Sequence, residues 1–166
     1  MKKLFANWLT SAALEDDRII LVSGDYCFKM FDELKNKRPK QYLNVGVCEQ
    51  SMIGFASGLA LQGYIPYVYS ITPFILERAF EQLKLDLGYQ KQHVVCVGYS
   101  EYPNDGPTHA ELDFEKLVSL LPNFRYAIPR CLASARDSLH QSLNTKSPWF
   151  IKLKDAPTWP AEGRDA

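Results

Sequence analysis

The spacing of hydrophobic positions alternates along the chain between a helical period and short apolar runs. Residues 2–15 repeat Leu and aromatic side chains at helical spacing, which predicts an amphipathic helix. Residues 18–23 form a short apolar run, as is typical of a buried parallel strand. The same criteria predict further strands at residues 42–45, 65–70, 93–98, 124–128 and 149–153, and further helices at residues 28–35, 48–62, 74–88, 113–121 and 131–144.

This alternation predicts the α/β class: a three-layer α/β/α fold with a mainly parallel six-stranded sheet. The domain is expected over residues 1–155, with an irregular C-terminal tail at residues 156–166. Ligands of such sheets bind beyond the carboxyl ends of the strands. Loops at this edge carry Asp25, Glu49, Phe74 and the segment 104–109, so we expect a ligand site there.

Length and charge exclude several classes of protein. The 166 residues fit one domain, and 19 Lys and Arg balance 19 Asp and Glu without a block of either sign. This balance disfavours a nucleic-acid groove or a basic membrane face. No segment is long and apolar enough for a signal peptide or a membrane span, so a cytoplasmic protein is expected.

Several common kinds of site are absent from the sequence. The cysteines lie far apart, without zinc-ligand spacing or the pattern of a disulfide framework. The chain also lacks a Gly-x-Gly-x-x-Gly motif, a Walker loop and a nucleophile elbow. We therefore predict no metal site on this chain.

Glu49 begins the predicted helix 48–62, whose residues are mostly apolar or small, so the helix is expected to be buried. One interpretation of Glu49 is a first-turn acid that the helix dipole favours. The alternative is a functional carboxyl, because a buried charge needs a partner and a protonated carboxyl can donate to a ring nitrogen. Gly54 and Gly58 indicate close approach of another helix, which a second subunit could supply.

Three further residues are candidates for a site. Phe74 follows Pro73 at a helix start and is either a core residue or an aromatic face that stacks on a planar ring. Arg78 follows Phe74 by one helical turn, so both are expected to face the same way. His109 ends a loop stiffened by proline and is either a surface histidine or a hydrogen-bonding partner of a substrate.

The sequence resembles the pyrimidine-binding domain of transketolase-like enzymes, which include deoxyxylulose phosphate synthase and the second chains of split bacterial transketolases. The resemblance runs from about residue 2 to residue 153. It is carried by GDYCFKMFD, by YLNVGVCEQSMIGFASGLALQGYIPYVYSITPFILERAFEQLKLDL and by NDGPTHAELDFEKLVSLLPN. Its specific signal is a pair of motifs, Gly-x-x-Glu-Gln at a helix start and Asp-Gly-Pro-Thr-His further along the chain.

The resemblance implies the role of each candidate in a thiamine-diphosphate enzyme. Glu49 matches the acid that hydrogen-bonds N1′ of the aminopyrimidine ring and favours its imino tautomer. Phe74 matches an aromatic that packs on this ring, and His109 matches a histidine that contacts the substrate. Asp25 matches an acid near the thiazolium ring, and Arg78 joins the cofactor-binding residues through its position one turn after Phe74.

The resemblance also implies a partner chain. Full transketolases carry a diphosphate-binding domain with its magnesium motif before this domain, and a further domain after it. Thiamine diphosphate is therefore expected at the interface with a partner subunit that supplies the Mg²⁺ ligands. We expect self-association of this chain and a heterotetramer with two copies of each subunit.

The substrate stays open. Ile71 stands where some relatives have a second aromatic, and Arg130 is out of register with the arginine that clamps a substrate phosphate. The expected reaction is transfer of a ketol or acyl unit from a small sugar or 2-oxo-acid substrate. The alternatives are a subunit of a two-chain 2-oxo-acid decarboxylase and a non-catalytic interaction subunit that retains the fold.

Overall fold

A computed structural model of the protein describes residues 1–27, 29–100 and 102–154. Its strands form one six-stranded sheet in the order β2-β1-β3-β4-β6-β5, and every neighbouring pair is parallel. The strands are β1 (Ile19–Ser23), β2 (Tyr42–Asn44), β3 (Ile65–Ile71), β4 (Val95–Tyr99), β5 (Arg125–Ala127) and β6 (Trp149–Leu153). The predicted fold class is confirmed, whereas the expected tail at 156–166 lies outside the described residues.

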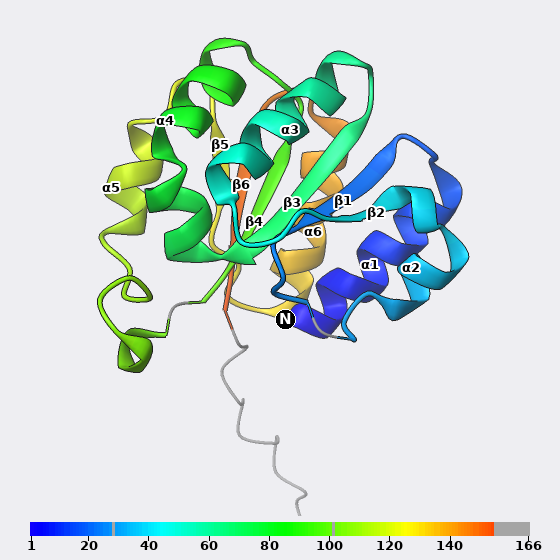
Figure 1. The fold of residues 1–166 in the computed structure, drawn as a ribbon, viewed down its shortest axis with the longest axis horizontal. Helices are drawn as coiled ribbons and strands as arrows, with labels where there is room; N and C mark the ends of the chain where they lie inside the picture. Colours follow the sequence, from blue (N-terminus) through cyan, green and yellow to red (C-terminus); the bar gives the residue numbers. More distant parts are fainter. Residues whose placement is uncertain (28, 101, 155–166) are drawn as a thin grey trace, which may run out of the picture.

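Helices cover both faces of the sheet, which gives the three predicted layers (Figure 1). One face carries α1 (Lys2–Glu15), α2 (Asp32–Lys37) and α6 (Leu132–Asn144). The opposite face carries α3 (Glu49–Leu61), η2 (Phe74–Arg78), α4 (Phe80–Gln82), η3 (Leu83–Tyr89) and α5 (Phe114–Ser119). Two short 3-10 turns, η1 (Pro39–Gln41) and η4 (Pro103–Asp105), complete the elements. The strands end toward the lower edge of Figure 1, where the N-terminus also lies.

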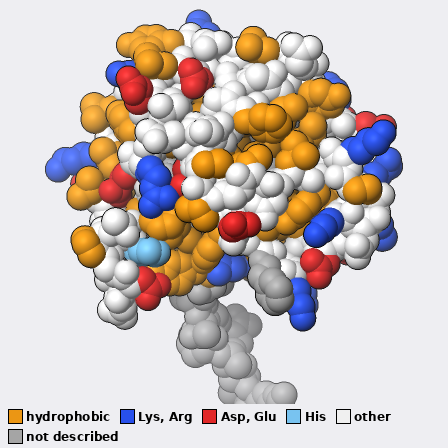
Figure 2. All heavy atoms as spheres, in the orientation of Figure 1, with side chains coloured by type: hydrophobic (Ala, Val, Ile, Leu, Met, Phe, Trp, Pro, Cys, Tyr) orange, Lys and Arg blue, Asp and Glu red, His pale blue; other side chains and the backbone are white. Residues whose placement is uncertain are grey.

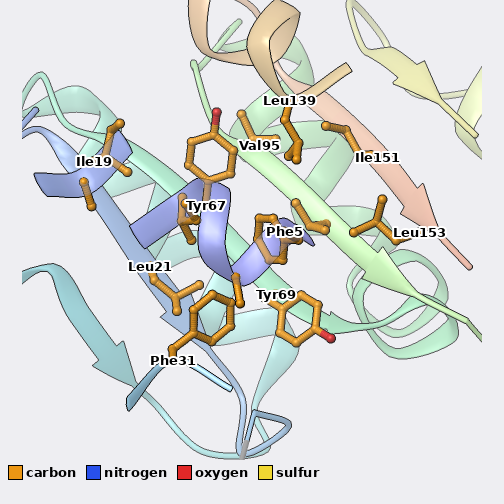
Figure 3. Close-up of a cluster of buried hydrophobic side chains, with 14 of the residues drawn as sticks. Phe5, Ile19, Leu21, Phe31, Tyr67, Tyr69, Val95, Leu139, Ile151 and Leu153 are labelled. Atoms are coloured by element: carbon orange, nitrogen blue, oxygen red, sulfur yellow. The ribbon is translucent and has the colours of Figure 1, made fainter. Parts of the chain in front are cut away.

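The core under α1 is built from aromatic side chains. Figure 3 shows Phe5 of α1 between Tyr67 and Tyr69 of β3. The Phe5 ring centroid lies 5.4 Å from that of Tyr69 and 5.6 Å from that of Phe31. All four side chains are buried, so this face of the sheet is closed by residues of the chain itself.

The predicted helix over residues 74–88 is wrong in one respect, because the segment is not a regular α-helix. It consists of the π-helical turns η2 and η3 on either side of the short α4. A π turn contains an additional residue and is common at functional sites. The wider first turn places the guanidinium carbon of Arg78 3.9 Å from the centroid of the Phe74 ring.

Two other predictions need correction. The helix expected at 28–35 begins later, at Asp32, and Lys29 has a left-handed backbone with φ of 57° that does not belong to a helix. The helix α3 was expected to be buried, but Phe55 and Leu61 are 46% and 62% exposed. A Cβ atom on Gly58 would meet no atom within 4 Å, so the described part of the chain packs nothing against it.

Candidate functional site

Glu49 lies at the start of α3 and points into the protein. Its side chain is only 1% exposed, so it is not an ordinary first-turn acid on the surface. Ser70, near the end of β3, donates from Oγ to Glu49 Oε1 at 3.4 Å, and Arg78 of η2 donates from NH1 to Oε2 at 2.7 Å. The charged partner and the hydrogen bonds reduce the cost of burying this carboxylate.

The end of β1 approaches Glu49 closely because of a glycine. A Cβ atom on Gly24 would lie 2.9 Å from the carbonyl oxygen of Gly46 and 3.8 Å from Glu49 Oε1. Gly46 itself has a φ of 79°, which an L side chain rarely adopts. These two glycines let the loop before α3 fold over the strand end, and that path directs Glu49 inward.

Arg78 connects Glu49 to Phe74. Its guanidinium donates to the Glu49 carboxylate and stacks at 3.9 Å on the Phe74 ring, while its side chain stays 37% exposed. The expectation that Arg78 and Phe74 face the same way is confirmed. The planar guanidinium of Arg78 thus contacts the buried Glu49 carboxylate on one side and the aromatic face of Phe74 on the other.

His109 reaches this group from the loop after β4. Its ring centroid lies 4.8 Å from that of Phe74, with the two rings inclined at 63°. The loop is closed by hydrogen bonds from Tyr102 N to His109 O at 2.9 Å and from His109 N to Gly106 O at 3.0 Å. A shallow hollow of about 290 Å³ opens beside these rings, lined by Pro73, Phe74, Glu77, Arg78, Pro107 and Thr108.

Asp25 stands apart from this group. Its backbone is left-handed, with φ of 58°, and Asn44 Nδ2 donates to Asp25 Oδ1 at 2.6 Å. It lines a separate hollow of about 590 Å³ together with Lys2, Tyr26 and Lys29 on the side of α1. The structure therefore brings together Glu49, Phe74, Arg78 and His109, which we call the Glu49 cluster, and places Asp25 in the neighbouring hollow.

Two polar groups at the same edge were missed by the sequence analysis. Lys2 Nζ donates to the hydroxyls of Tyr26 at 3.3 Å and Tyr102 at 3.2 Å, and lies 4.0 Å from the Tyr99 ring centroid. A second, buried ion pair joins Lys152 to Glu111. Neither group has a local signal, because each joins residues that are far apart in the sequence.

Two pKa shifts concern groups that lie outside the cluster. Burial raises the pKa of the Tyr69 hydroxyl above its ordinary value of 10.0, so this side chain stays neutral near pH 7. Burial lowers the pKa of His93 below its ordinary value of 6.5, although the hydrogen bond to Ser142 O acts in the opposite direction. Both groups lie on the face of the sheet that α1 and α6 cover or at its margin, away from Glu49.

Comparison with known protein families identifies the family of this domain. A family model described as the transketolase pyrimidine-binding domain matches residues 1–155. The chain belongs to this family. Membership of the transketolase pyrimidine-binding family implies dependence on thiamine diphosphate.

Proteins from several bacteria are similar in sequence to this chain. The chain is 28% identical over 161 residues to the 6-deoxy-6-sulfo-D-fructose transketolase subunit SqwH of Clostridium sp. (strain MSTE9). This match covers 95% of this chain and 50% of the relative. The chain is 30% identical over 158 residues to the 1-deoxy-D-xylulose-5-phosphate synthase of Nitratidesulfovibrio vulgaris (strain DP4), covering 90% of this chain and 24% of that enzyme. The chain thus spans about half the length, or less, of these relatives.

Solved structures share the fold. A split gene transketolase, described as an inactive beta4 tetramer, superimposes with a TM-score of 0.83 at 22% identity, over 98% of this chain and 54% of that one. A transketolase from Campylobacter jejuni gives a TM-score of 0.81 at 18% identity, over 92% of this chain and 25% of that one.

None of the helices in the described part of the chain has the length and apolar character that crossing a bilayer requires.

Proposed function

We propose that this chain is the pyrimidine-binding subunit of a two-chain thiamine-diphosphate enzyme that transfers a ketol or acyl unit. The observation that carries the proposal is the Glu49 cluster, in which Arg78 joins a buried carboxylate to an aromatic face at the carboxyl edge of the sheet. An apulose-4-phosphate transketolase subunit from Actinobacillus succinogenes supports the two-chain arrangement. It is 31% identical over 118 residues, which are 69% of this chain and 38% of that protein.

The side chains of the cluster fit an aminopyrimidine ring. Such a ring is planar and presents nitrogen atoms at its edge, so it can stack on a phenyl ring and hydrogen-bond a carboxyl at the same time. The Arg78 guanidinium already does both, toward Phe74 and Glu49. A ring that binds between the same two residues requires Arg78 to move aside.

Each residue of the cluster then has a separate task. Glu49 holds a proton between its carboxyl oxygen and the ring nitrogen, and its burial keeps water from competing for that proton. Phe74 orients the ring by contact with one face, and His109, whose ring lies against Phe74, hydrogen-bonds the substrate. Bound thiamine diphosphate supplies the carbanion chemistry of the reaction. Asp25 is proposed to face the thiazolium end.

The partner subunit is proposed to hold the diphosphate and the Mg²⁺ ion. In the described residues, no three His, Cys, Asp or Glu side chains come together in a group that could hold a metal ion. The exposed apolar residues of α3 offer an interface for self-association, and Figure 2 shows hydrophobic side chains in several groups on the side where α3 faces the viewer. We infer a cytoplasmic heterotetramer with two copies of each subunit.

The substrate class is a small sugar or a 2-oxo acid. Arg130, which does not match a phosphate-clamping arginine in the sequence, does not line the hollow beside Phe74. A two-chain 2-oxo-acid decarboxylase is the alternative enzyme, and assays of the assembled enzyme with ketose phosphates and 2-oxo acids separate the two. A non-catalytic subunit that retains the fold is the third alternative, and the burial of Glu49 against Arg78, which lines the hollow, argues against it.

The substitution Glu49→Gln tests the proposal in the complex with the partner subunit. Glutamine keeps the size but cannot supply an acidic proton, so hydrogen–deuterium exchange at cofactor C2 and turnover should fall by about 10²–10⁴. The matched control is Glu81→Gln on α4, an exposed glutamate outside the cluster, which should exchange normally. Near-normal C2 exchange in a folded, assembled Glu49→Gln enzyme would refute the proposed role.

A further inference from the structure

Lys152 is a buried lysine near the carboxyl end of β6, at the edge of the sheet that carries the Glu49 cluster. It lies on β6, and its side chain is 6% exposed while that of its ion-pair partner, Glu111, is 3% exposed. The ammonium group also lies 5.0 Å from the centroid of the Phe114 ring. Two charges withdrawn from water to this extent are stable only when they stay together.

The partner of Lys152 belongs to the loop that carries His109. Glu111 is the second residue after His109, and the next residue, Leu112, donates its backbone N–H to Glu77 Oε1 at 2.8 Å. Glu77 belongs to η2, the same turn that supplies Phe74 and Arg78. The loop is therefore fixed at two adjacent points, one on the sheet and one on the turn that forms the site.

We propose that the Glu111–Lys152 ion pair positions His109 against Phe74. The strand holds Lys152 in place, whereas Glu111 lies in the segment between η4 and α5, outside any helix or strand. Loss of either charge leaves the other desolvated, and the loop is then the part that shifts to let water reach it. The His109 ring, 4.8 Å from Phe74, moves with the loop. The catalytic consequence rests on the proposed function, but the position of His109 does not.

Nuclear magnetic resonance on the full chain tests the position directly. The chain has three histidines, and His93 and His140 serve as internal references because they contact Ser142 and Trp8 instead of the loop. The Phe74 ring should shift the imidazole protons of His109, and Phe74→Leu measures how large this shift is. In Lys152→Met the His109 signals should move to the Phe74→Leu values, while the signals of the other two histidines stay unchanged.

Further variants separate positioning from general stability. Lys152→Arg keeps the charge and should retain the His109 signals. Leu139→Ala weakens the buried core under α6 on the opposite face and should also leave them unchanged. Glu111→Gln breaks the pair from the loop side and decides the matter if Lys152→Met does not fold. Unchanged His109 signals in either folded variant that breaks the pair would overturn the proposal.

Kinetics of the complex with the partner subunit test the catalytic consequence. Misplacement of a substrate-contacting group can cost about 10²-fold in rate, so Lys152→Met should raise KM or lower turnover by about 10-fold to 100-fold. Cofactor affinity and C2 exchange should stay normal, because Glu49 is untouched. A displaced His109 with unchanged kinetics would overturn the catalytic part alone. Failure of the Glu49→Gln test with a displaced His109 would refute the proposed function and leave the positioning role intact.

Discussion

The two faces of the sheet differ in how completely this chain covers them. Under α1 and α6 the core is closed, and Phe5, Leu9 and Leu139 are fully buried in it. On the opposite face α3 leaves Phe55 and Leu61 exposed, and π-helical turns replace a regular helix. Glu49, Phe74 and Arg78 of the candidate site all come from this less regular face. The face that holds the site is thus the face whose exposed apolar side chains are available for contact with a second chain.

Two phenylalanine substitutions, one on each face of the sheet, test the difference between the faces with the largest expected effect. Phe5→Ala removes a fully buried ring from the closed face and should lower the free energy of unfolding by about 3–5 kcal/mol. Phe55→Ala removes a ring that is 46% exposed and should cost the isolated subunit less than about 1 kcal/mol. Chemical denaturation of the isolated chain, at a concentration too low for self-association, measures both values.

When assembly is measured instead of stability, Phe55→Ala should have the larger effect and Phe5→Ala the smaller one. Phe55→Ala should weaken self-association or binding of the partner, which analytical ultracentrifugation detects, because α3 presents this ring to the outside. Phe5→Ala should leave association of the folded fraction unchanged. If Phe55→Ala assembles like the parent protein, the exposed face of α3 is not an interface and the contrast between the two faces loses its functional meaning.

A double-mutant cycle on Glu49 and Arg78 tests the less regular face itself. Arg78→Ala leaves the Glu49 carboxylate, which is 1% exposed, with Ser70 as its remaining side-chain partner among the described residues. Arg78→Ala should therefore destabilise the chain much less when Glu49→Gln has already removed the charge. We expect a coupling free energy of about 0.5–3 kcal/mol from denaturation of the four proteins.

The cycle also tests how the cofactor reaches the cluster. Because Arg78 occupies the space between Phe74 and the carboxylate, its removal should change the affinity of the assembled enzyme for thiamine diphosphate, as calorimetry would show. If the effects of the two substitutions on stability are additive and the affinity for thiamine diphosphate is unchanged, Arg78 is only a surface residue.

The sequence predicts best the elements that have a clear local hydrophobic pattern. The bounds of α1 and of β6 agree with the predicted ranges 2–15 and 149–153, because local hydrophobic periodicity determines both elements. Clustering of Glu49, Phe74 and His109 at one edge follows from the rule for parallel strands, and the distances between their elements confirm it. Their roles in catalysis remain predictions.

The irregular features depend on contacts that local sequence does not encode. The π turn at η2 accompanies the Glu49–Arg78 pair, whose members are 29 residues apart. The Glu111–Lys152 pair spans 41 residues, and no periodicity in either segment indicates it. The exposure of α3 was missed because an apolar helix gives the same pattern whether its cover comes from its own chain or from another.

The smallest effect is expected from acid titration at the margin of the closed face. His93 Nε2 donates to Ser142 O at 2.8 Å, and burial lowers the pKa of His93 below 6.5. On acidification the unfolded chain therefore takes up a proton at His93 before the folded chain does, so stability falls as the pH drops below that value. Because the ring is partly exposed, we expect a loss of less than about 1 kcal/mol.

His93→Gln keeps a donor for Ser142 without a titrating group, and it should flatten the dependence of unfolding free energy on pH between about pH 7 and pH 5. His140→Gln is the matched control, because His140 is exposed and glutamine can still accept the hydrogen bond from Trp8 Nε1. An equally steep profile in His93→Gln would assign the acid sensitivity to other groups and leave no role for burial at this margin.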